Sequence, residues 1–149
     1  MNKILIAPLC LALLLGTASP LLSANPAPVA ADDVEKVVYH VNDSEHAMTV
    51  LRNVQNHINA SKTARIAVVT HGPGIDFLLN GVKDRNGNPY EPVVQTLKDR
   101  GVDFRVCRNT LRSRNLDDKA VLYEASVVPS GVAEIGRLQA REGYVYLKP

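Results

Sequence analysis

The sequence Ile66-Ala67-Val68-Val69-Thr70-His71-Gly72-Pro73-Gly74 indicates the class of fold more clearly than any other part of the chain. Its apolar residues follow one another without the polar alternation of a half-exposed strand. Near-continuous runs of this kind are typical of strands that are covered on both faces, as in parallel sheets. Glycine and proline then end the run abruptly. We therefore predict a buried strand over residues 66–70.

Helix and strand patterns alternate on both sides of this run. A β-branched run at 37–41 precedes Ser44, a good N-cap residue, and apolar residues then recur at helical spacing from Met48 to Ile58. The other predicted strands cover 102–107, 125–128 and 144–147, and the other predicted helices cover 92–101, 109–116 and 132–141.

This order predicts an α/β fold. Strands that alternate with helices form a parallel sheet, here of about five strands, because each right-handed crossover places a helix on a face of the sheet. In the last predicted helix, Val132, Ile135 and Leu138 are expected to share the apolar face. Gly143 is expected to end that helix.

The first residues have the layout of a secretory signal peptide. Lys3 precedes an uncharged apolar run at 4–15, and small residues follow as far as Ala24. The run is about a dozen residues long, which is short of a membrane-spanning helix, so we expect no stable membrane anchor. We predict a signal peptide over 1–24 and a Pro- and Ala-rich flexible lead-in over 25–33. Cleavage near Ala18 or Ala31 remains open.

The mature chain would then be a single domain at 34–149 in the periplasm or outside the cell. Its charge is nearly balanced, because removing Lys3 leaves 16 basic residues against 15 acidic ones. Without a basic run or many aromatic residues, no nucleic-acid partner is expected. Cys10 lies in the leader, so Cys107 has no partner in the mature chain. Such a cysteine is a reactive thiol, an intermolecular bridge or an inert buried residue.

Polar residues collect where the predicted strands end. His40 and His71 lie near the ends of the first two strands, Cys107-Arg108-Asn109 ends the third, and Ser130 follows the fourth. Ligands of open parallel sheets bind outside the carboxyl ends of the strands. The sequence therefore predicts that these residues meet at one edge of the sheet.

Cys107 is the candidate nucleophile. Alternation along the strand places it on the more polar face, close to the start of the next helix. The helix dipole and nearby cations (Arg108, Arg112 and Arg114) would favour the thiolate. The opposing interpretation is a small apolar side chain that fills a gap.

His40 and His71 are candidate general acids or bases, although each could also do no more than bond a loop carbonyl. Arg108, Asn109 and Ser130 are a candidate site for substrate or anion, and the arginines could equally be a solvated face or a subunit contact. No metal is expected, because Cys107 and the two histidines have no diagnostic spacing. No cofactor is expected, because His-Gly-Pro-Gly is neither a phosphate loop nor a dinucleotide motif. His46 and His57 are predicted to be surface residues.

Three segments together resemble the DsrE/DsrF-like family. They are Val-Asp-Phe-Arg-Val-Cys-Arg-Asn-Thr-Leu at 102–111, Val-Pro-Ser-Gly-Val-Ala-Glu-Ile at 128–135, and His-Gly-Pro-Gly-Ile at 71–75. The resemblance covers about 35–149 and implies a three-layer α/β/α sandwich that assembles into trimers or hexamers. It also places Cys107 at the position that carries a persulfide in the sulfur-relay members. Those members tend to have glycine where Asn115 stands, and they are generally cytoplasmic.

Two functions compete at this point. The first is sulfur handling, as a sulfurtransferase or a sulfur carrier, by an exported homo-oligomer that uses Cys107 and an external thiol or sulfur-carrier partner. The second is a non-catalytic homo-oligomeric binding or assembly module with an inert cysteine. A flavin or nucleotide binder of flavodoxin-like type is a third interpretation, but no phosphate-binding loop supports it.

Overall fold

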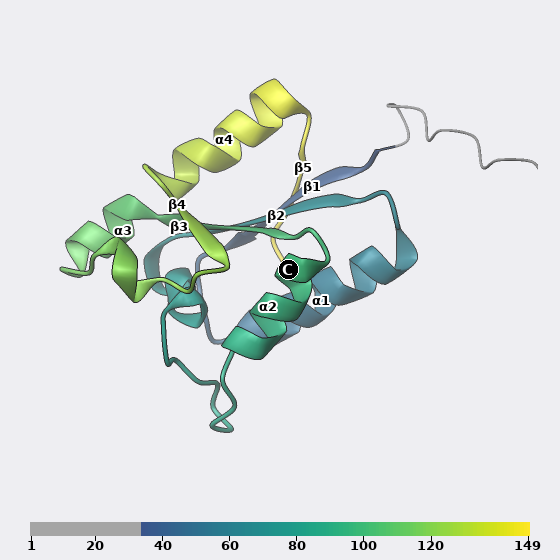
Figure 1. The fold of residues 1–149 in the computed structure, drawn as a ribbon. Coiled ribbons are helices and arrows are strands. Elements are labelled where there is room, and N and C mark those ends of the chain that lie inside the picture. Colours follow the sequence, from purple (N-terminus) through teal and green to yellow (C-terminus); the bar gives the residue numbers. More distant parts are fainter. Residues whose placement is uncertain (1–33) are drawn as a thin grey trace, which may run out of the picture.

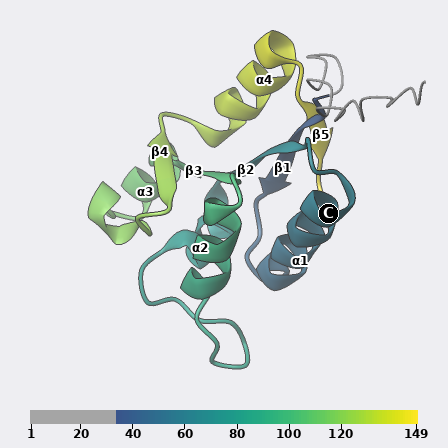
Figure 2. The same cartoon turned by 45° about the vertical axis from the view of Figure 1, so that its right-hand side comes forward.

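Residues 34–149, which are those that the structure describes, form a five-stranded sheet in this computed structural model (Figure 1). The strands are β1 (Lys36–Val41), β2 (Arg65–Thr70), β3 (Asp103–Cys107), β4 (Ala125–Val128) and β5 (Val145–Leu147). All pairings are parallel, in the order β4-β3-β2-β1-β5, so the predicted parallel sheet is confirmed. Figure 2 shows β4 and β5 at opposite edges. The predicted signal peptide and lead-in, 1–33, lie outside the described residues.

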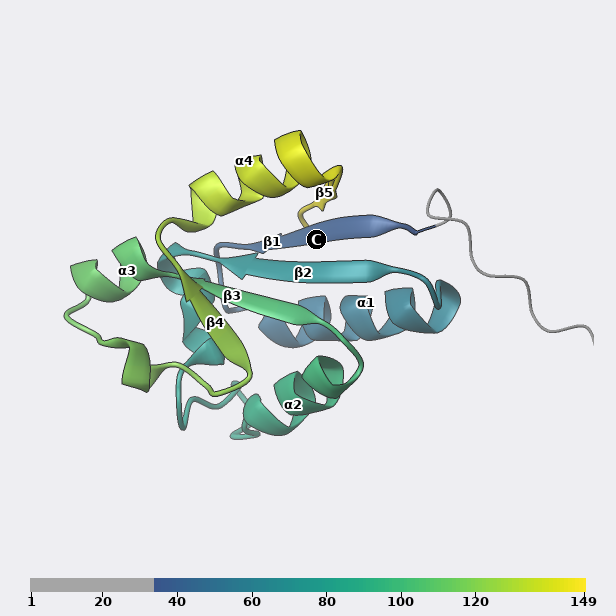
Figure 3. The same cartoon turned by 45° about the horizontal axis from the view of Figure 1, so that its top comes forward.

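Helices cover both faces of the sheet, as the alternating pattern predicts. The α-helices are α1 (Ala47–Ala60), α2 (Glu91–Asp99), α3 (Arg108–Ser113) and α4 (Gly131–Glu142), and the 3-10 helices are η2 (Gly72–Leu78) and η3 (Asp118–Ala120). In Figure 3, α1 and α2 lie below the sheet and α4 lies above it, while α3 lies beyond the carboxyl ends of the strands. The fold is therefore a three-layer α/β/α sandwich. Within residues 34–149, no helix combines the length and the apolar character that a membrane crossing requires.

The two layers of core explain why the strand at 66–70 shows no polar alternation. Ile66 and Val68 face α1 and α2, where Phe77, Phe104 and Leu51 are fully buried. Ala67 and Val69 face the opposite way and pack with Ile135 and Leu138 of α4. Alternate residues of a strand point to opposite faces, so a strand covered on both sides needs apolar residues throughout.

The ends of the helices differ from expectation in two main places. Helix α3 ends at Ser113 and not near residue 116, and Asn115 beyond it has a left-handed φ of 54°. Helix α1 begins at Ala47 with His46 as its N-cap residue, and the Ser44 side chain does not cap it. Ser44 instead belongs to the preceding turn, where its carbonyl accepts the Ala47 N–H. Gly143 ends α4 with a left-handed φ of 73°, as predicted.

Two side chains occupy different environments from those predicted. Val132 is 63% exposed, because the buried stripe of α4 is Gly131, Ile135 and Leu138, and Val132 lies about 100° around the helix from Gly131. His57 is not a surface residue, since its side chain is only 15% exposed. Its ring bonds the Tyr39 hydroxyl at 2.8 Å and Glu35 at 2.9 Å. A buried tyrosine hydroxyl requires such a partner.

Candidate functional site

Cys107 is the last residue of β3 and directly precedes α3. The residue is 4% exposed, so the thiol is largely removed from water. The pairing of Thr70 with Val106 aligns the residues that follow them, His71 and Cys107, at neighbouring strand ends. Because paired residues of parallel strands point to the same side, Cys107 and His71 both face the α4 layer.

Hydrogen-bond donors at the starts of two helices lower the pKa of the Cys107 thiol. Burial by itself raises the pKa of this thiol, but hydrogen bonds outweigh it, so the pKa of Cys107 lies below the ordinary value. The donors to the sulfur are the backbone N–H groups of Gly131, Thr110 and Asn109 together with the Thr110 hydroxyl. They belong to the first turns of α3 and α4, where N–H groups have no partner within the helix. A thiolate at Cys107 would supply the acceptor that these N–H groups lack within their helices. We call the four donors the thiolate cradle.

The arginines near Cys107 have other partners. Arg108 forms two 2.8 Å hydrogen bonds with Asp118. Arg114 pairs with Asp76, and Arg105 pairs with Asp103 and Glu134. The sequence suggested two causes for a lowered pKa of Cys107, the following helix start and nearby cations. The main causes are hydrogen bonds from backbone N–H groups at helix starts and from the Thr110 hydroxyl, and not the cations.

The predicted anion-site residues Arg108, Asn109 and Ser130 have different hydrogen-bond partners in the structure. Asn109 reaches Cys107, but through its backbone N–H. Ser130 is the N-cap residue of α4, and its hydroxyl accepts the Ala133 N–H at 3.4 Å. Arg108 points to Asp118, so its guanidinium already has a carboxylate partner.

His40 and His71 form a second group beside the cradle. Their Nε2 atoms lie 2.7 Å apart, and Nδ1 of His40 lies 2.7 Å from the Tyr146 hydroxyl. Burial lowers the pKa of both histidines, and the positive charge of Lys148 lowers it further. The pKa of His40 is also lowered by repulsion from His71. Both rings are therefore neutral near pH 7.

Gly131 connects the two groups. A Cβ atom at this position would lie 3.2 Å from the Cβ atoms of both Cys107 and His71, and 2.9 Å from the Thr70 carbonyl oxygen. Only glycine allows α4 to approach the strand ends this closely. His40 and His71 lie together. Among the described residues, these two histidines and Cys107 do not form a three-ligand group that could hold a metal ion.

Sequence reasoning missed three members of this site: Gly131, Thr110 and Tyr146. Thr110 could have been found, because it stands three residues after Cys107 at the start of the predicted helix. Its hydroxyl also accepts the Gly72 N–H at 2.9 Å, which ties α3 to η2. The positions of Gly131 and Tyr146 at the site depend on the strand order, which the sequence does not reveal.

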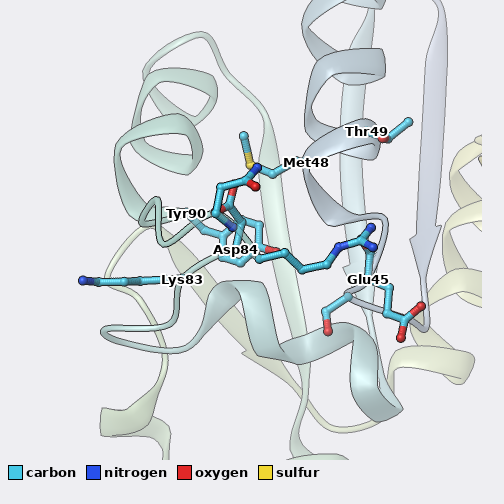
Figure 4. A pocket seen from close by; sticks show the side chains of 9 residues that line it. Glu45, Met48, Thr49, Lys83, Asp84 and Tyr90 are labelled. Carbon is cyan, nitrogen blue, oxygen red and sulfur yellow. The ribbon is translucent and has the colours of Figure 1, made fainter.

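A separate hollow of about 310 Å³ lies between the start of α1 and the loop before α2. Figure 4 shows Met48 above Tyr90 and Asp84, with Lys83 and Glu45 directed to opposite sides. Neither Cys107 nor His71 lines it. A further hollow of about 230 Å³ lies beside His40 and Lys148.

Known proteins support the family resemblance. The model of the DsrE/DsrF-like family matches residues 35–149. A protein of unknown function from Methanobacterium thermoautotrophicum, MTH1491, has a solved structure that is 32% identical, with a TM-score of 0.69. The ychN protein of E. coli shares the fold with a TM-score of 0.65 at 14% identity. Each similarity covers 77% of this chain and 99% of the solved chain. No curated protein matches the chain. From its family match and its fold, the chain belongs to the DsrE/DsrF-like family.

Proposed function

We propose that Cys107 accepts sulfane sulfur as a persulfide and passes it to an external thiol. The observation that carries the proposal is the thiolate cradle, which stabilises a negative sulfur in a site that is 4% exposed. The same donors would stabilise the thiolate that returns when the persulfide is removed. The thiolate is the reactive form of cysteine, and its protonation would stop the reaction.

The chemistry needs only thiols. The Cys107 thiolate attacks the outer sulfur of a hydropersulfide, R–S–S–H, and a new S–S bond forms on Cys107. The bond between the two donor sulfurs breaks, its electron pair leaves on R–S⁻, and a proton converts R–S⁻ to R–SH. A second thiolate then removes the outer sulfur and regenerates the Cys107 thiolate. Cys107 is the free cysteine of residues 34–149, and Cys10 falls in the signal peptide that we expect to be removed, so the proposal takes this second thiol from another molecule.

The biological setting is part of the proposal. With a cleaved signal peptide, the protein would work in the periplasm or outside the cell, as a homo-oligomer of the trimeric or hexameric kind found in the family. The acceptor there would be a low-molecular-weight thiol or a sulfur-carrier protein. The low exposure of Cys107, 4%, favours donors that present a terminal sulfur atom over donors with a bulky reacting centre.

Mass spectrometry of the intact protein tests the proposal. After incubation with polysulfide or thiosulfate, the protein should gain about 32 Da, the mass of one sulfur atom, and a thiol such as glutathione should remove it. The Cys107→Ser variant should gain nothing. The proposal is wrong if wild-type protein stays unmodified by both donors while iodoacetamide still alkylates Cys107.

A non-catalytic binding or assembly module is the second candidate function. Its support is the burial of Cys107 together with the exposed apolar residues Val145, Tyr146 and Leu147 on the edge strand β5. In this case Cys107→Ser would keep the oligomeric state, measured by sedimentation, and every partner interaction. The persulfide measurement separates the two functions directly.

A further inference from the structure

We propose that Tyr146, His40 and His71 form a proton relay between the Cys107 site and solvent. The relay rests on the proposed sulfur transfer, since that reaction must move a proton. It assigns Tyr146, which sequence reasoning did not consider, as the outer end of the relay. His71 is its inner end, beside Cys107.

The geometry is that of a continuous hydrogen-bonded chain. The Tyr146 hydroxyl lies 2.7 Å from His40 Nδ1, and His40 Nε2 lies 2.7 Å from His71 Nε2. The ring centroids of the two histidines are 4.7 Å apart. The strand register pairs Val38 with both Tyr146 and Ala67, so the relay crosses β5, β1 and β2 on the face of the sheet that carries α4.

The hydrogen-bonded relay has two possible arrangements of its hydrogen atoms. In the first, Tyr146 donates to His40 Nδ1, His40 Nε2–H donates to His71 Nε2, and His71 Nδ1 carries a hydrogen. In the second, every bond is reversed, and His71 Nδ1 has a free lone pair. Among residues 34–149, His71 Nδ1 has no hydrogen-bond partner. Nδ1 is therefore the free ring atom at the inner end of the relay. His71 and Cys107 stand at neighbouring strand ends on the same face of the sheet, with both Cβ atoms against Gly131, so we assign Nδ1 as the atom that exchanges a proton with the sulfur site.

Switching between the arrangements moves one proton without leaving a charge on a histidine. When the second arrangement accepts a proton from the Cys107 thiol at His71 Nδ1, each hydrogen shifts by one bond, and Tyr146 releases its outer proton to water. The first arrangement results. When R–S⁻ later takes the Nδ1 hydrogen, the shifts reverse and Tyr146 recovers a proton from water. The thiol proton thus reaches the leaving group, and the relay returns to its starting state.

The surroundings favour a neutral relay. The nearby cation is Lys148, which disfavours protonated histidine at both positions. Neither His40 nor His71 pairs with a carboxylate within the described part of the chain, whereas His57 bonds Glu35. On the α4 side, the uncharged Gly131 backbone faces His71. Tyr146 is 39% exposed, which gives the outer end access to water.

Nitrogen-15 NMR of the histidine rings tests the relay without any sulfur donor. Tyr146→Phe removes one end of the chain, and we expect it to shift the ring nitrogen signals of His71 as well as those of His40. Tyr144→Phe is the matched control, because the Tyr144 hydroxyl is not part of the relay. Its ring packs against the core between the sheet and α4, which includes Ile135 and Leu138. Unchanged His71 signals in Tyr146→Phe would overturn the relay, whatever the rate of sulfur transfer.

Sulfur-transfer kinetics test what the relay does for Cys107. We expect Tyr146→Phe and His40→Gln to slow transfer from a hydropersulfide by about 100-fold, the lower range for general acid–base catalysis. The pH midpoint of Cys107 alkylation should stay as in wild type, because the cradle sets it. Persulfide formation at the wild-type rate in both variants would overturn the relay's role. A wild-type protein that forms no persulfide would instead refute the sulfur-transfer function. The NMR result would still decide whether Tyr146, His40 and His71 form a continuous hydrogen-bonded relay.

Discussion

The backbone of Gly131 lies against the side chain of Cys107. A Cβ atom added at Gly131 would sit 3.2 Å from the Cys107 Cβ and 2.9 Å from the backbone oxygen of Thr70. The sheet cannot yield easily at Thr70, because that residue is fully buried. The start of α4 must therefore move if position 131 carries any side chain, and the N–H donor of Gly131 moves with it.

Gly131→Ala should destabilise the fold and weaken the thiolate. We expect a loss of about 1–3 kcal/mol in unfolding free energy, as for other overpacked sites, and slower alkylation of Cys107 at neutral pH. Gly136→Ala is the control in the same helix, since a Cβ there meets nothing within 4 Å. It should stabilise the protein by about 0.5–1 kcal/mol. Urea unfolding and iodoacetamide kinetics measure both effects, and equal behaviour of the two variants would contradict the close approach.

Thr110 offers a direct test of the cradle. Thr110→Val keeps the shape of the side chain but removes the hydroxyl that bonds the Cys107 sulfur and accepts the Gly72 N–H. A hydrogen bond to a charged group contributes about 1.5–3 kcal/mol, so the pKa of Cys107 should rise and alkylation near pH 7 should slow about tenfold.

Thr110→Ser is the matched variant, because it keeps the hydroxyl. Its alkylation profile against pH should stay close to that of the wild type. If valine and serine variants give the same profile, the hydroxyl does not stabilise the thiolate.

The position of Cys107 was predictable from the sequence, because it depends on local patterns. Apolar alternation over 102–107 and the following polar residues were enough to place the thiol at a strand end. The contribution of the helix that follows Cys107 to its lowered pKa was also predictable, but the contribution of Gly131 was not. Gly131 lies on another helix, and only the pairing of β3 with β4 brings that helix start to the sulfur.

The partners of the charged side chains also could not be predicted from the sequence. A sequence displays Arg108 beside Cys107 but not Asp118, which holds its guanidinium elsewhere. His57 looked exposed because the helix pattern around it is polar, whereas its environment is fixed by Tyr39 on a separate strand. Periodicity reveals burial within one element, but hydrogen-bond partners depend on how elements meet.

Asn115 carries a conformational requirement. Its φ of 54° lies in the left-handed region, just beyond the end of α3, a conformation that glycine adopts without strain. Asn115→Gly should therefore be neutral or slightly stabilising, whereas Asn115→Val should cost about 1–2 kcal/mol, because a β-branched residue fits this region poorly. Thermal unfolding of the two variants measures the difference. Equal melting temperatures would contradict the left-handed assignment.

Glu134 should make stability depend on pH. Hydrogen bonds from Arg137 are the main cause of its lowered pKa, and the nearby charge of Arg105 lowers it further. The folded-state pKa is therefore below the ordinary 4.5, so its contribution to stability is present above that value and is lost as pH falls through the folded pKa. Glu134→Gln should then reduce unfolding free energy near neutral pH by about 1–2 kcal/mol, because the side chain is only 11% exposed and loses charge-assisted bonds.

The difference between wild type and Glu134→Gln should shrink in acid, since the protonated carboxyl of the wild type resembles the amide of the variant. Urea unfolding at about pH 7 and about pH 3 measures it. Glu91→Gln is the control, because Glu91 is exposed on α2, on the other side of the sheet from α4. A deficit of the Glu134 variant that stays constant across this range would mean that lost packing, and not the charge of Glu134 beside Arg105 and Arg137, causes it.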